Sequence, residues 1–196
     1  MNRFLVVVTA MLAGAGSGFA QAPPPAQPLT LSASLLRSYN TIKLNLTEEA
    51  EKMPEADYGF KPGPAPELRT YGMLFAHTAT SQFGSCSAVL GVPNPNQGRN
   101  LEVELKTKAE FVKALADSFA LCDKAFAALT EQNALEMVKQ GQNDVARAAV
   151  LANTVIHSNE MYGTGAVYMR AKGLVPPSTE RAAAGRGGAR GAAPGQ

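Results

Sequence analysis

Apolar residues recur at three- and four-residue steps in four segments of the chain, and no segment shows the strict alternation typical of a strand. The first segment runs from about Ser32 to Met53 and ends at Pro54, which cannot continue a helix. The second spans Tyr71–Leu90, with Thr70 as the N-cap and Gly91 as the stop. These patterns predict the first two helices of one domain.

The third and fourth segments carry clear signals at their ends. Thr107 followed three residues later by Glu110 is a capping box, so a helix is predicted to begin there. The fourth helix is predicted to begin near Asn143 and to end at Gly173, and Pro176 prevents its continuation. Two of the links are longer than the ~2–8 residues common between helices. The sequence therefore predicts an all-α fold, a four-helix bundle with long crossover loops.

The two ends of the chain differ in composition from its middle. Residues 1–20 have the layout of a secretory signal peptide, with a cation, a short apolar run and small residues before an expected cleavage after Ala20. The apolar run is shorter than the ~20 residues that span a bilayer, which favours export to the periplasm or the exterior over a membrane anchor. Residues 21–29 are predicted to be a proline-rich linker, 30–178 one domain and 179–196 a disordered Gly/Ala/Arg-rich tail.

Charge and motifs exclude some functions. The formal net charge is +2, and the excess cations lie in the signal peptide and the tail. The folded part has no basic signature for nucleic acid, and no aromatic residue is interleaved with the arginines of the tail, so nucleic acid is not an expected partner. No nucleophile elbow and no phosphate-binding glycine loop are present, and the catalytic residues are therefore left unassigned.

The two histidines of the chain are the candidates for a binding site. His77 lies within the second predicted helix and His157 within the fourth, and facing helices of a bundle can bring such residues together. Glu160 and Met161 follow His157 by three and four residues, so they share its side of the helix. Two imidazoles and a carboxylate suit a divalent metal such as zinc or nickel. The alternative is two ordinary histidines at the edge of the core.

Two stretches, "HSNEMYGTGAVYMRAKGLVPPST" and "YGFKPGPAPELRTYGMLFAHTA", resemble the DinB-like family of metal-binding four-helix bundles. The resemblance implies three histidines around one divalent ion, one from the second helix and two from an H-x-x-x-H-x-G-[QN] pattern in the fourth. His77 and His157 match two of these positions, but Met161 stands where the third histidine is expected and Thr164 where Gln or Asn is usual. The resemblance also implies that dimers are common, so a homodimer is expected.

The altered third position leaves three alternatives for the site. Met161 can fill the volume of a lost imidazole and leave no metal bound. Glu160 can replace the missing ligand, or the thioether of Met161 can join His77 and His157 in a copper site. Two functions follow: a non-catalytic protein that binds a small molecule or an envelope protein, or a divalent-metal-dependent hydrolase or transferase. The first is preferred.

The two cysteines, Cys86 and Cys122, allow two interpretations. In an exported chain they favour a disulfide. However, Cys86 follows His77 by nine residues, which places it on the opposite face of the second helix, away from the side on which His77 lies. On that ground two buried thiols are expected, and the apolar face that holds Cys86 is expected to be covered by the long loops or by a second subunit.

Overall fold

The computed structural model describes residues 28–191, with side chains as far as Gly185. The predicted signal peptide, most of the linker and the last five residues of the tail lie outside the described residues. Within residues 28–191 the long helices of the bundle are α1 (Leu31–Lys52), α2 (Tyr71–Leu90), α4 (Lys108–Ala127) and α5 (Arg147–Ala171). The other elements are η1 (Glu55–Asp57), α3 (Leu101–Glu104), β1 (Met137–Gln140), β2 (Asn143–Ala146) and α6 (Pro177–Gly191). The predicted all-α four-helix bundle is confirmed.

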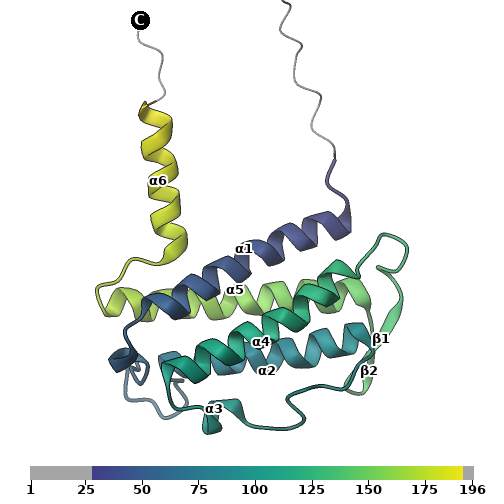
Figure 1. Ribbon diagram of the computed structural model, residues 1–196, viewed down its shortest axis with the longest axis horizontal. Coiled ribbons are helices and arrows are strands. Elements are labelled where there is room, and N and C mark those ends of the chain that lie inside the picture. The colour runs from purple at the N-terminus through teal and green to yellow at the C-terminus, as the bar shows by residue number, and fades with distance from the viewer. Residues whose placement is uncertain (1–27, 192–196) are drawn as a thin grey trace, which may run out of the picture.

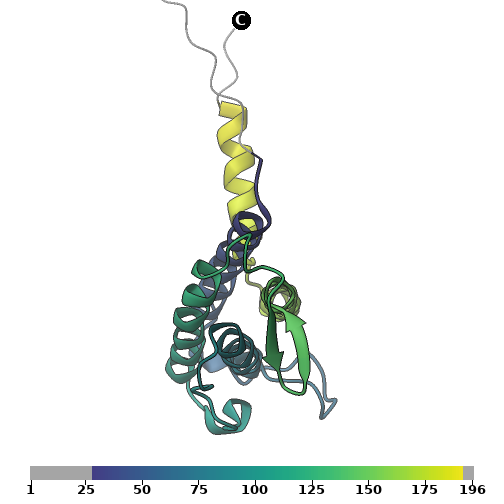
Figure 2. The ribbon, with the colours of Figure 1, turned by 90° about the vertical axis from the view of Figure 1, so that its right-hand side faces the viewer.

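The four long helices form a bundle in which α4 and α5 each pack against both α1 and α2 (Figures 1 and 2). Helix α2 therefore has neighbours on two faces, which explains why its sequence is apolar on two sides. The face that holds Cys86 is covered mainly by α4, and α3 in the long link after α2 also packs against α2. Among residues 28–191 no helix is both long and apolar enough to cross a membrane.

Most of the predicted helix ends are confirmed. The side chains of Thr70 and Thr107 accept hydrogen bonds from the third residues of α2 and α4, as N-caps do. Gly91 and Gly173 follow α2 and α5 with φ of +66° and +74°, the left-handed conformation that glycine adopts most readily.

The start of the fourth long helix differs from the prediction. Asn143 is not an N-cap but the first residue of β2, which pairs with β1 in an antiparallel hairpin that turns at Gly141. Helix α5 begins at Arg147, and its first N–H groups donate to the backbone carbonyls of Glu136 and Ala134 at 2.8 and 2.9 Å. These backbone carbonyls take the place of a capping side chain. For this reason no typical N-cap residue precedes Arg147 in the sequence.

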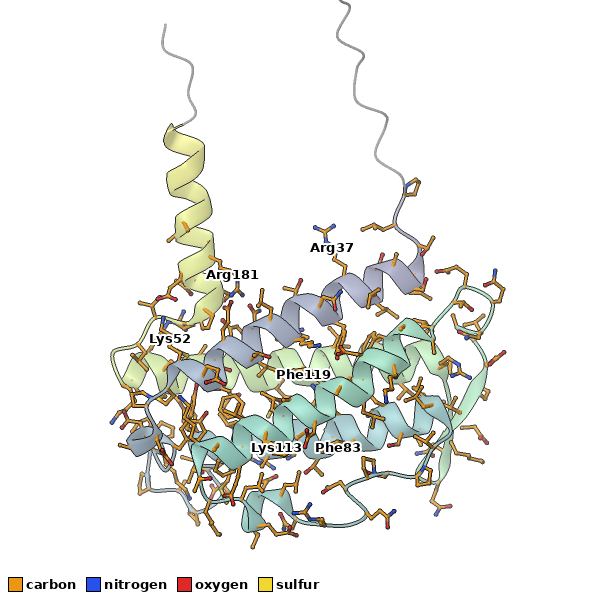
Figure 3. All side chains as sticks on the ribbon, in the orientation of Figure 1. Arg37, Lys52, Phe83, Lys113, Phe119 and Arg181 are labelled. Carbon is orange, nitrogen blue, oxygen red and sulfur yellow. A yellow bond between two sulfur atoms is a disulfide. The ribbon has the colours of Figure 1, made fainter. Side chains whose placement is uncertain are left out.

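The beginning of the predicted disordered tail is helical. Residues 179–191 belong to α6, which extends away from the bundle (Figure 1). Pro177 suits the first helical position, and the alanines after it favour a helix. Arg181 pairs with Glu48, and Glu180 pairs with Lys52, so α6 is tied to α1 where the two helices meet (Figure 3). Residues 179–191 of the predicted tail are therefore helical.

Gly72 allows α2 and α4 to approach each other, and a substitution there tests this packing. A Cβ added at Gly72 would lie 2.5 Å from Cε2 of the Phe111 ring, which is buried and stacks on Tyr58. We expect Gly72→Ala to lower the free energy of unfolding by about 1–3 kcal/mol in urea titrations, because the buried ring would have to shift to admit the new methyl group. Gly163→Ala is the matched control: its Cβ would meet no atom within 4 Å, so helix propensity should stabilise that variant. A Gly72→Ala protein as stable as wild type would contradict this view of the packing.

Candidate functional site

The structure brings the two histidines together. His77 projects from α2 and His157 from α5, and their ring centroids lie 5.0 Å apart in an edge-to-face arrangement. Both side chains are partly buried, with 29% and 28% of their surface exposed. They are therefore close to each other and still accessible to a small ligand.

Each imidazole uses its Nδ1 atom in a contact with a carboxylate. Nδ1 of His77 lies 2.8 Å from Oε1 of Glu102, and Nδ1 of His157 lies 3.3 Å from Oε2 of Glu160. An ionised carboxylate only accepts hydrogen bonds, so these contacts favour the tautomers with the proton on Nδ1. This leaves Nε2 of each ring as the nitrogen available to a ligand.

Glu102 is a site residue that sequence reasoning missed. It belongs to α3, within the long link between α2 and α4, and its second carboxylate oxygen accepts a hydrogen bond from Nε of Arg69 at 2.9 Å. In the sequence Glu102 is one acid among several in a loop, and only the route of the link through space places it beside His77. The spacing of residues along the sequence does not indicate that Glu102 contacts His77.

Glu160 and Met161, the two further candidates, occupy different environments. The side chain of Glu160 is 67% exposed and stands beside His157. Met161 is buried and packs within the hydrophobic core. The third ligand position that the family resemblance implies is thus occupied by an apolar side chain in the core.

A polar cleft of about 490 Å³ opens beside the histidines. The hairpin forms part of its wall, since Gln140 at the end of β1 donates from Nε2 to Oγ of Ser85 in α2 at 3.3 Å. Glu160 lines this cleft and Met161 does not. Most of the other lining side chains carry a hydroxyl or a carboxamide: Thr80, Ser81, Ser85, Gln140, Asn153 and Thr154.

The donor set fits a metal ion only in part. Two imidazole nitrogens at this separation suit a divalent first-row metal such as zinc or nickel. However, the part of the chain that the structure describes contains no group of three or more His, Cys, Asp or Glu side chains close enough to hold an ion. Glu160 would have to leave Nδ1 of His157 to become a third ligand.

The cysteines form a disulfide, and the expectation of two buried thiols is wrong. Cys86 in α2 is bonded to Cys122 in α4, with a Cα–Cα distance of 5.1 Å. Cys86 and His77 do lie on opposite faces of α2, as their spacing predicts. The inference failed because both faces are interior: His77 faces α5, and Cys86 faces α4.

One carboxyl away from the cleft has a strongly shifted pKa. Glu49 of α1 is fully buried, and burial raises its pKa from 4.5 to about 9. Neither of its carboxyl oxygens has a hydrogen-bond partner among the described residues. The carboxyl lies so close to α5 that a Cβ added at Gly165 would be 2.7 Å from Oε1. Glu49 does not line the cleft beside the histidines.

Comparison with known proteins identifies the fold but no activity. No family model matches the sequence, and no curated protein matches it. A DinB-like protein from Bacillus cereus ATCC 10987 is similar in structure, with a TM-score of 0.61 and 16% sequence identity over 73% of this chain and 93% of that chain. A DinB-like protein from Bacillus subtilis has a TM-score of 0.54 at 20% identity, over 72% of this chain and 94% of its own. A conserved protein from Enterococcus faecalis has a TM-score of 0.53 at 18% identity, over 71% and 93%.

Proposed function

We propose that this chain, which has the fold of the DinB-like proteins, is an exported binding protein whose His77–His157 cleft takes a small polar molecule without catalysing its reaction. The position of Met161 carries the proposal. With Met161 in the core, the cleft offers two imidazoles where a metal centre of this type would have three. Catalytic zinc sites generally use three protein ligands and keep one position open.

The lining of the cleft supports a polar ligand. Hydroxyl and carboxamide groups recognise a ligand through hydrogen bonds whose geometry fixes its orientation. The imidazoles of His77 and His157 add two further polar groups to the lining of the cleft. A neutral polar molecule with several hydrogen-bonding groups matches this set better than an apolar one.

The disulfide supports the exported location. Disulfides persist in oxidising compartments and are rare in the cytosol. The sequence contains two cysteines, and both are in the Cys86–Cys122 bond. This agrees with the signal-peptide pattern of residues 1–20, which lie outside the described part of the chain.

A second candidate function, a divalent-metal-dependent hydrolase or transferase, is favoured by the position of Glu160. Its carboxylate lines the cleft and lies 3.3 Å from His157, so a rotation of its side chain could supply the third ligand. His77, His157 and Glu160 would then hold the ion, which would supply Lewis-acid activation of a substrate.

Titration with Zn²⁺, Ni²⁺ and Cu⁺ by calorimetry tests the proposal. Wild-type protein without an affinity tag should bind zinc with a dissociation constant weaker than about 1 μM, and Met161→His should bind at least about tenfold more tightly because it restores a third imidazole. Met169→His is the matched control, since Met169 is also buried in α5 but follows His157 by twelve residues, about 3.3 turns, and it should show no gain. Sub-micromolar zinc binding by wild type, lost in both His157→Ala and Glu160→Gln, would instead support the metal-dependent enzyme.

A further inference from the structure

We propose that Glu102 is a positioning residue for the cleft: it holds His77 in the form with the proton on Nδ1, so that the lone pair of Nε2 is presented to a ligand. This deepens the proposed function, on which the importance of His77 rests. The orientation of His77 itself needs no ligand and can be tested in the free protein.

The carboxylate of Glu102 is held in place through both of its oxygens. One carboxylate oxygen lies 2.8 Å from Nδ1 of His77, and the other lies 2.9 Å from Nε of Arg69. Glu102 and His77 are both partly buried, with 25% and 29% of their side chains exposed. A carboxylate held from two sides has little freedom to turn, and a hydrogen bond to an ionised acceptor is shorter and stronger than one to a neutral acceptor.

The fold fixes Glu102 and Arg69, the second partner of Glu102, from outside α2. The short helix α3 packs against α2, and Leu101, beside Glu102, is buried. Asn100 caps α3, because its side chain accepts a hydrogen bond from the N–H of Val103. Arg69 precedes α2, and its carbonyl accepts a hydrogen bond from the hydroxyl of Tyr168 in α5 at 2.9 Å. The long link between α2 and α4 thus places the carboxylate of Glu102 beside His77 of α2.

The two histidines are therefore held unequally. His77 is paired with the partly buried Glu102, whereas His157 is paired at 3.3 Å with Glu160, whose side chain is 67% exposed. An exposed pair of this kind is weak and easily exchanged for water or a ligand. We infer that the imidazole of His77 is held in one orientation by Glu102, whereas that of His157 can exchange its hydrogen-bond partner. Carboxylates that orient histidines in this way fix the tautomer and raise the basicity of the free nitrogen.

The test is the tautomer of His77, read from ¹⁵N–¹H correlation spectra of the histidine-labelled protein at pH 8.5, where imidazole in solution is neutral. The chain has two histidines, so a His157→Gln variant assigns both spin systems. Wild type should show His77 with the proton on Nδ1, and Glu102→Ala should move that proton wholly or largely to Nε2 without changing the tautomer of His157. Glu104→Ala is the matched control, because Glu104 lies in the same helix and pairs with Arg99, not with a histidine.

A wild-type spectrum with the proton on Nε2 of His77, or an unchanged His77 spectrum in a folded Glu102→Ala protein, would overturn the proposal. A second measurement uses Zn²⁺ alone as the ligand of the Met161→His protein. Adding Glu102→Ala should weaken binding about 10- to 100-fold, and adding Glu104→Ala should not. If Met161→His gains no zinc affinity, the proposed function fails, because it assumes that Met161 replaces a third metal ligand. The spectra still decide the role of Glu102 in that case.

Discussion

Glu49→Gln is expected to stabilise the protein by about 4 kcal/mol at pH 7.5, because the wild type must keep a buried carboxyl protonated. The pKa of Glu49 is raised by burial from 4.5 to about 9. Between these two values the unfolded chain ionises Glu49 and the folded chain does not. Stability is therefore complete below the unfolded pKa and falls by about 1.4 kcal/mol per pH unit until the pH reaches the folded pKa. A neutral amide of the same shape has no such dependence.

Urea unfolding between pH 4.5 and pH 9 measures this effect. The two proteins should differ by only about 0.4 kcal/mol at pH 4.5, where Glu49 is neutral in the folded chain and half ionised in the unfolded chain, and should diverge as the pH rises. Glu48→Gln is the control on the same helix: its side chain is 42% exposed and pairs with Arg181, so the substitution should change stability by less than about 1 kcal/mol. Parallel pH profiles for wild type and Glu49→Gln would show that the carboxyl is ionised in the fold.

The helices could be predicted from the sequence where their ends depend on local chemistry. Thr107 and Glu110 form a capping box within four residues, and Gly91 supplies its own left-handed turn. The hairpin before α5 could not be predicted in this way. Its strands have four residues each, and Val138 and Val145 form one half-buried apolar pair between them. An apolar pattern this short cannot be distinguished from a loop in the sequence.

The site could be predicted only as far as it depends on rare residue types. His77 and His157 stand out in the sequence, and their positions in helix bodies led to the correct expectation that they face each other. Glu102 could not be found because its contact depends on the path of a long link. Cys86 was misjudged for a related reason: helical phase gives the direction of a side chain, but not which neighbouring helix lies in that direction.

Removal of the disulfide is expected to cost about 4 kcal/mol, the value that the chain-entropy relation gives for a loop closed between residues 36 apart. Cys86→Ala with Cys122→Ala should lower the free energy of unfolding by this amount in urea, and a reducing agent should lower that of wild type similarly. The reducing agent should leave the double variant unchanged, because it has no cysteine left to reduce. Two free thiols in wild-type protein unfolded without reductant would contradict the bond and remove the main structural support for export.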